Sequence, residues 1–286
     1  MKDQIENIVE EYSASRINRR DFFTRLIAVF GTYAAAQLFL EQSGLAQTIV
    51  STIESDLANV DSSTVDYMNG DVKLSGYLSK PKKKGKYPAI VVIHENRGLN
   101  DHTRDVARRF AAEGYVALAV DALSRKGGTA AMDTPEKVRE AFTAIAPDIM
   151  KDLNAGLAFL NSHTNVKKGK LASIGFCWGG ARSFLLSTEQ NDLKAAVVFY
   201  GSPPADDLLA KVHCPVFGLY GETDTRITST VPKVTETMTK LGKKYGSKIY
   251  PATGHAFFND TRAEAYKPEA AKDAWMQTLT FLKKTL

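Results

Sequence analysis

One of the two cysteines in the chain stands where a nucleophile would be expected. The segment 171–180 reads LASIGFCWGG, which predicts a buried strand that turns sharply into a helix over 181–188. Cys177 lies at the apex, between Gly175 and Gly179, and glycines are needed where a strained turn brings backbone segments together. A thiol at a helix N-terminus is stabilised as the thiolate, which attacks carbonyl groups. For this motif alone, an ordinary buried cysteine is the alternative.

An acid and a histidine follow in the chain order that a nucleophilic triad needs. The apolar segment 214–220 predicts a strand that ends at Asp224, and the segment 247–251 predicts another that leads to His255. Singly, these residues would be a turn aspartate and a solvated loop histidine. Together with Cys177 they form a set in which His255 takes the thiol proton and Asp224 fixes the imidazole tautomer.

Acyl transfer also needs two N–H donors for the oxyanion. In this arrangement one donor is the backbone of the residue after the nucleophile, which is Trp178, and the other comes from a loop after an early strand. The apolar segment 89–94 predicts that strand, and Asn96 in the loop after it is the candidate for the second donor.

The elements that must position these residues alternate along the chain. Short, nearly continuous apolar runs separated by helical patterns predict a mostly parallel sheet that is covered on both faces. Strands over 63–67 and 72–78 flank Asn69-Gly70, which predicts an antiparallel hairpin before the sheet. With the G-x-C-x-G turn, this layout predicts an α/β-hydrolase fold over 60–286 and a helical extension over 1–50. The buried strands are expected at 89–93, 115–120, 171–175, 195–199 and 215–220.

The chain resembles the dienelactone hydrolases, the cysteine-dependent carboxymethylenebutenolidase family. The matching segments are HENRGLN (94–100), GFCWGG (175–180), GETD (221–224) and GHAF (254–257). The resemblance implies a carboxylic ester hydrolase that cleaves a small ester or lactone through a Cys-His-Asp triad and an acyl-enzyme, without a cofactor. The alternative is a non-hydrolytic protein of this fold that uses a reactive thiol for sensing or binding.

The resemblance also implies a role for Glu95. In that family the matching glutamate contacts the thiol in the resting enzyme and is displaced by substrate, so that the thiolate forms. The alternative is a carboxylate that caps its own loop.

The substrate pocket departs from the family pattern. The family holds its substrate carboxylate with two arginines, and Arg139 matches the first, while the second position is Asn259. Loss of that arginine removes a charge-assisted contact, which Arg262 or Arg125 could replace in space. We therefore expect esterase or lactonase activity rather than true dienelactone specificity. A solvated arginine on an amphipathic helix is the alternative for Arg139.

Composition limits the partners. The net charge is +5, but the basic residues are dispersed, and the dense run Lys80–Lys86 reads as a surface loop, so no nucleic-acid partner is predicted. Two cysteines after different strands predict no disulfide. The chain carries no zinc-binding spacing and no phosphate-binding loop, so neither a metal nor a cofactor is predicted.

The N-terminus allows two interpretations. The segment 18–24, NRRDFFT, resembles a twin-arginine export signal with a cleavage site near Ala46, which would place the enzyme in the periplasm. Alternatively, Ile5–Tyr12 and a helix capped by Asn18 form a structured extension of a cytoplasmic protein, packed on the body or joining a homodimer. The apolar run 26–40 is too short and too interrupted for a stable membrane span.

Overall fold

The N-terminal part of the chain forms a unit of its own. The computed structural model describes residues 2–13, 25–26, 28–30, 39 and 58–286, and the chain divides into compact units at Met1–Val60 and Asp61–Leu286. Helix α1 (Lys2–Ser13) confirms the helix predicted for Ile5–Tyr12.

One face of α1 is apolar. Ile5, Ile8 and Val9 are buried, at the spacing that places side chains on one side of a helix. The predicted cap at Asn18, the twin-arginine segment and the cleavage site near Ala46 lie outside the described residues. Among the described residues, every helix is too short or too polar to cross a lipid bilayer.

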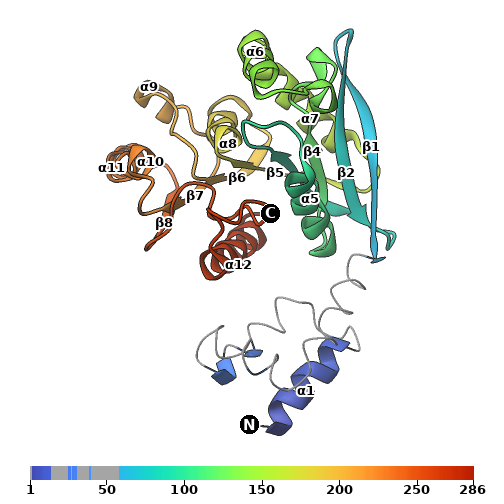
Figure 1. Cartoon of the computed structure of the whole chain (residues 1–286), viewed down its shortest axis with the longest axis vertical. Helices are drawn as coiled ribbons and strands as arrows, with labels where there is room; N and C mark the ends of the chain where they lie inside the picture. The colour runs from blue at the N-terminus through green and yellow to red at the C-terminus, as the bar shows by residue number, and fades with distance from the viewer. Residues whose placement is uncertain (1, 14–24, 27, 31–38, 40–57) are drawn as a thin grey trace. The chain divides into compact units, whose positions relative to one another are not determined.

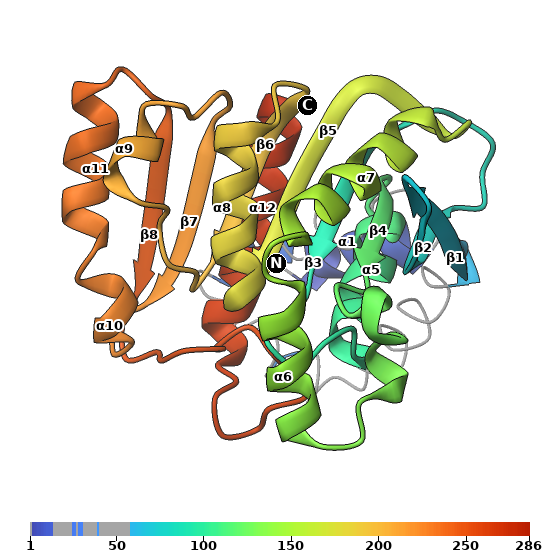
Figure 2. The same ribbon diagram turned by 90° about the horizontal axis from the view of Figure 1, so that it is seen from above.

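The larger unit is built on one sheet of eight strands in the order β1-β2-β4-β3-β5-β6-β7-β8, as Figure 2 shows. All neighbouring pairs from β4 through β8 are parallel, and β2 pairs with β4 in the antiparallel sense. The predicted sheet is confirmed. Its strands are β1 (Val60–Asn69), β2 (Val72–Pro81), β3 (Tyr87–Ile93), β4 (Val116–Val120), β5 (Val166–Phe176), β6 (Leu193–Phe199), β7 (Val216–Gly221) and β8 (Tyr245–Tyr250).

Helices cover both faces of the sheet (Figures 1 and 2). Alternate residues of β3 enter different cores: Val91 joins the core beneath α7, whereas Ile90 and Val92 join the core beneath α5 and α12. Burial on both faces explains why the strands read as continuous apolar runs. The helices of this unit are α5 (Asp101–Ala112), α6 (Pro135–Ile145), α7 (Ile149–Ser162), α8 (Trp178–Glu189), α9 (Asp206–Leu209), α10 (Thr225–Thr228), α11 (Val231–Lys240) and α12 (Pro268–Thr285), with 3₁₀ turns η1 (Ser124–Lys126) and η2 (Thr129–Ala131).

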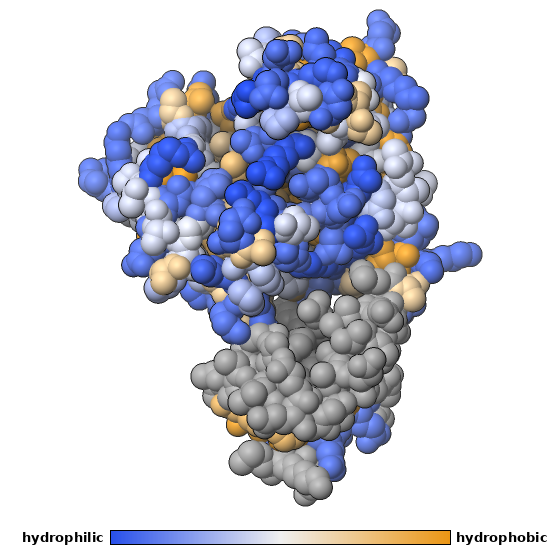
Figure 3. All heavy atoms as spheres, viewed as in Figure 1, coloured by the Kyte–Doolittle hydropathy of each residue, from blue (hydrophilic) through white to orange (hydrophobic). Residues whose placement is uncertain are grey.

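The predicted hairpin is confirmed at Asn69-Gly70, where Gly70 takes a positive φ of 57° between β1 and β2. In the view of Figure 3, hydrophilic residues cover most of the surface of the larger unit, and apolar residues appear there in small separate areas.

Candidate active site

The residues selected from the sequence follow strands that end at one edge of the sheet. Glu95 follows β3, Cys177 follows β5, Asp224 follows β7 and His255 follows β8. These strands run parallel, so their carboxyl ends lie at the same edge. Ligands of open parallel sheets bind outside this edge, and it is the place where side chains from distant segments can act together.

The turn at Cys177 is shaped by backbone contacts. Cys177 has a φ of 55°, and its N–H donates to the carbonyl of Phe199 at 3.0 Å. A Cβ at Gly175 would lie 1.9 Å from the carbonyl oxygen of Gly179, and a Cβ at Gly179 would lie 2.3 Å from that of Ile93. The glycines are therefore required, as predicted. The turn leaves the half-buried thiol at the N-cap of α8.

His255 is oriented by Asp224. The imidazole Nδ1 lies 2.5 Å from Oδ2 of Asp224, whose side chain is 9% exposed. Burial alone would lower the pKa of His255, but hydrogen bonding to Cys177 and Asp224 and the negative charge of both raise it from 6.5 to about 9. Those interactions connect the imidazole to the thiol on one side and the carboxylate on the other.

The raised pKa of His255 makes stability depend on pH. Because the folded-state pKa of about 9 exceeds the ordinary value of 6.5, the imidazolium stabilises the fold fully below pH 6.5, and this contribution is lost as the pH rises through 9. We expect the difference in unfolding free energy between the wild type and His255→Gln to shrink between pH 6.5 and 9 in urea titrations. As an internal control, the difference in unfolding free energy should not change between pH 5 and 6. If it stays constant up to pH 9, the raised pKa of His255 would be contradicted.

Glu95 is buried, with 3% of its surface exposed. The hydroxyl of Tyr200 donates to its Oε1 at 3.2 Å, and Nδ2 of Asn259 donates to its Oε2 at 3.1 Å. Burial, and then the charges of Glu95 and Cys177, hold the pKa of Tyr200 far above its usual value, so this phenol remains a donor. Within the described part of the chain, no hydrogen bond joins Glu95 to Cys177, and the role of Glu95 toward the thiol stays a prediction.

Sequence reasoning missed Tyr200. It directly follows β6, with a φ of 40°, and its ring centroid lies 5.0 Å from that of His255. Its place directly after a parallel strand was the available signal, because Cys177, Asp224 and His255 also follow parallel strands.

The two predicted oxyanion donors belong to segments that pack together. The ring of Trp178 stacks on that of His94 at a centroid distance of 5.8 Å, and Phe142 of α6 contacts Trp178 at 4.6 Å. His94 accepts from the N–H of Ala122 at Nε2, and its Nδ1 lies 2.6 Å from the carbonyl of Glu95. Burial lowers the pKa of His94 and keeps its imidazole neutral, which matches one accepting and one donating nitrogen.

This packing leaves the predicted donors available. In the described residues, neither the backbone N–H of Asn96 nor that of Trp178 donates a hydrogen bond. Their role as oxyanion donors stays a prediction.

The arginines considered as substrate anchors are all paired with carboxylates. Arg139 is 71% exposed on α6, so its role as an anchor stays a prediction. The positive charge of Arg262 opposes the rise in the pKa of Tyr200. The pairs are Arg139 with Glu136 at 2.8 Å, Arg125 with Asp152 at 2.6 Å, and Arg262 with Glu264 at 3.0 Å.

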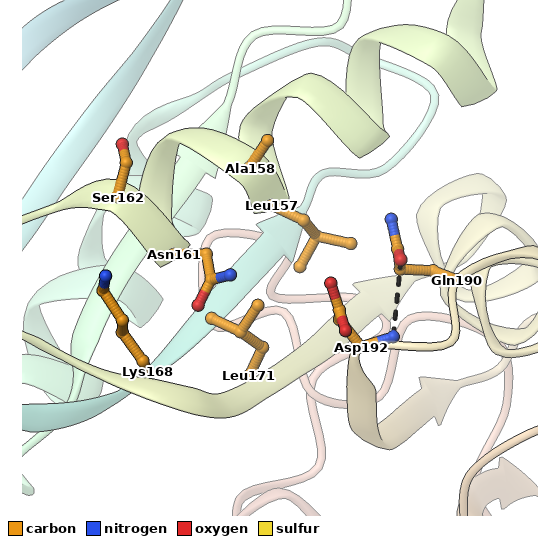
Figure 4. Close-up of a pocket in the computed structure, with 8 residues that line it drawn as sticks. All are labelled: Leu157, Ala158, Asn161, Ser162, Lys168, Leu171, Gln190 and Asp192. Atoms are coloured by element: carbon orange, nitrogen blue, oxygen red, sulfur yellow. Dashed lines mark hydrogen bonds between the residues drawn. The ribbon is translucent and has the colours of Figure 1, made fainter.

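A separate hollow of about 320 Å³ lies between α7, the beginning of β5 and the segment after α8 (Figure 4). It is located where β5 begins, whereas Cys177 follows the opposite end of that strand, so the hollow is not part of the candidate active site. Within the described ranges, no group of three or more His, Cys, Asp or Glu side chains is placed to hold a metal ion. The hollow is lined by Leu157, Ala158, Asn161, Ser162, Lys168, Leu171, Gln190 and Asp192.

Comparison with solved structures agrees with the fold. A crystal structure from Klebsiella pneumoniae, provisionally described as a dienelactone hydrolase, is 28% identical with a TM-score of 0.73 and covers 79% of this chain and 99% of its own. The acylaminoacyl peptidase of Pyrococcus horikoshii is 15% identical with a TM-score of 0.66 over 82% of this chain and 43% of its own, and this likeness concerns the fold alone. Both support the α/β-hydrolase fold predicted from the sequence.

Comparison with known sequences identifies the family. The model of the dienelactone hydrolase family matches residues 74–286. A provisionally named carboxymethylenebutenolidase of Methylorubrum extorquens is 32% identical over 238 residues, which cover 79% of this chain and 81% of the relative. One from Escherichia coli K12 is 32% identical over 255 residues, 84% of this chain and 92% of the relative. The chain therefore belongs to the dienelactone hydrolase family and is a carboxylic ester hydrolase.

Proposed function

We propose that this chain cleaves a small ester or lactone with Cys177 as the nucleophile, His255 as the base and Asp224 as the residue that orients the base. The observation that carries the proposal is the imidazole of His255, which is hydrogen-bonded to Asp224 and interacts with the thiol of Cys177. A thiol becomes an effective nucleophile when a neighbouring base holds its proton, and the base works best when a third group fixes its tautomer.

The reaction proceeds in two stages. With the proton of the pair held by His255, the sulfur of Cys177 forms a bond to the substrate carbonyl carbon, whose oxygen becomes an oxyanion bound by the N–H groups of Trp178 and Asn96. The C–O bond to the leaving group then breaks, and His255 delivers the proton to the leaving oxygen. Water attacks the resulting thioester with His255 as base, which releases the acid and restores the thiol.

The acyl-enzyme provides the direct test. On mixing with 4-nitrophenyl acetate and rapid acid quench, we expect the tryptic peptide that contains Cys177 to carry one acetyl group by mass spectrometry. The peptide with Cys214 is the internal control, because that thiol is buried and burial raises its pKa to about 12. Steady release of nitrophenol without acetylation of Cys177 would overturn the proposal.

A further inference from the structure

The loop that carries His255 is joined to helix α5 by the carboxylate of Asp260. Nδ1 of His102 lies 2.9 Å from Oδ1 of Asp260, and the guanidinium of Arg109 donates to Oδ2. Burial alone would raise the pKa of Asp260, but the hydrogen bond with His102 and the charge and hydrogen bond of Arg109 hold it well below its usual value. The group is therefore a carboxylate, which can only accept, so Nδ1 of His102 is the donor.

His102 packs between the segment of the thiol and the segment of the base. It is buried, and its ring lies edge-on to that of Phe176 at a centroid distance of 5.9 Å and to that of Phe258 at 6.0 Å. Phe176 is the last residue of β5 and directly precedes Cys177, whereas Phe258 belongs to the loop that follows His255. The two phenyl rings also stack on each other at 5.4 Å. One imidazole thus contacts both halves of the candidate pair.

Packing alone does not explain a histidine at position 102. Among the described residues, the buried Nε2 of His102 has no hydrogen-bond partner. A buried polar atom without a partner is destabilising, whereas a phenyl ring would fill the same space without that cost. What the imidazole supplies, and a phenyl ring could not, is the Nδ1–H that binds Asp260.

The chain between His255 and Asp260 can transmit a change of position. Residues 256–259 are each at most 2% exposed. The N–H of Asn259 donates to the carbonyl of Ala256 at 3.0 Å, which closes a turn. A close-packed turn cannot shift at one end without repacking. A displacement of Asp260 would therefore be passed on to His255.

We propose that His102 and Asp260 are positioning residues whose hydrogen bond fixes the loop 254–262 against α5 and the end of β5, and so keeps His255 in contact with Cys177. Neither side chain touches the substrate in this arrangement. The assignment rests on the proposed function, which identifies the base and the nucleophile. Small displacements matter here, because a misplacement of about 1 Å can cost on the order of 10²-fold in rate.

The test is the pKa of His255, measured by NMR from the Cε1–H signals of the five histidines. The signal of His255 is the one that disappears in His255→Gln. In Asp260→Ala this pKa should fall by roughly one unit, because the hydrogen bonds that raise it are loosened. The value of kcat/KM for 4-nitrophenyl acetate should fall about tenfold, mainly through kcat. An unchanged pKa would overturn the inference, since a merely structural role lowers stability without changing the proton affinity of His255.

Asp105→Ala is the matched control. The side chain of Asp105 is 26% exposed and that of Asp260 is 29% exposed, and both pair with Arg109. The ion pairs of Asp105, with Arg108 and Arg109, stay within α5 and do not reach the loop. We expect Asp105→Ala to keep the wild-type pKa of His255 and the wild-type kcat/KM. A fall as large as that in Asp260→Ala would refute the inference.

His102→Phe tests the same bond from the other side, and replaces Asp260→Ala if that variant fails to fold. The phenyl ring keeps the packing on Phe176 and Phe258 but cannot donate to Asp260, so the pKa of His255 and kcat should fall as in Asp260→Ala. A folded His102→Phe with the wild-type pKa of His255 would contradict the inference. This pKa is measured without an ester, whereas the proposed function is tested by acetylation of Cys177 in the wild type, so each can fail separately.

Discussion

Replacing Cys177 with alanine should reduce kcat/KM for 4-nitrophenyl acetate by about 10⁴-fold or more. A nucleophile and its base accelerate the reaction as a unit, so removing the nucleophile eliminates nearly all of the rate acceleration that the two provide together. The residue is half-buried at the apex of its turn, and alanine leaves no atom that can form the acyl-enzyme. The fold should survive, because the turn is held by backbone contacts rather than by the sulfur. Steady-state kinetics measure the loss of kcat/KM, and a urea titration measures whether the variant remains folded.

The second cysteine provides the matched control. Cys214 is buried, and burial raises the pKa of its thiol to about 12, so it remains protonated and unreactive. Cys214→Ala should retain wild-type kcat/KM. Substantial hydrolysis by Cys177→Ala, or loss of hydrolysis in a folded Cys214→Ala, would contradict the assignment of the nucleophile.

Replacing Gly175 with alanine should prevent folding. The new Cβ would lie 1.9 Å from the carbonyl oxygen and 2.2 Å from the carbonyl carbon of Gly179, and backbone atoms of a strand and a helix cannot move apart as a flexible side chain can. Overpacking of this severity exceeds the usual cost of about 1–3 kcal/mol for added methylenes, and we expect a loss above about 4 kcal/mol. Soluble yield and the free energy of unfolding in urea are the measurements.

Gly246→Ala is the control for that experiment. Gly246 lies in the edge strand β8, and a Cβ there meets only two ring carbons of Phe217, at 3.3 and 3.7 Å. Its unfolding free energy should stay within about 1 kcal/mol of the wild type, since a side chain can adjust by a few tenths of an ångström. A Gly175→Ala variant as stable as Gly246→Ala would show that the turn is not constrained as described.

The parts of the fold visible in the sequence are those whose cause is local. The central strands read as apolar runs because both faces are buried, and the turn at Cys177 carries its own glycines. By contrast, β5 begins at Val166 rather than at 171. Its first half is rich in exposed lysine, so neither hydrophobicity nor alternation marks it as a strand.

The partners of side chains could not be predicted in the same way. Glu95 meets Tyr200 and Asn259, which are 105 and 164 residues away along the chain. Arg125 is bound by Asp152 of α7, so it is engaged away from the loops that hold the candidate site. Such pairings depend on register and loop geometry, about which residue types carry no information.

The turn around Cys177 has a consequence for how this protein can change over evolutionary time. The close contacts that shape it involve main-chain atoms of β3, the start of α8 and the end of β6. The side chains next to this turn come instead from separate elements, such as Phe142 of α6, whose ring contacts that of Trp178. Mutation of such side chains can therefore change the surroundings of Cys177 while the main chain keeps the sulfur in place.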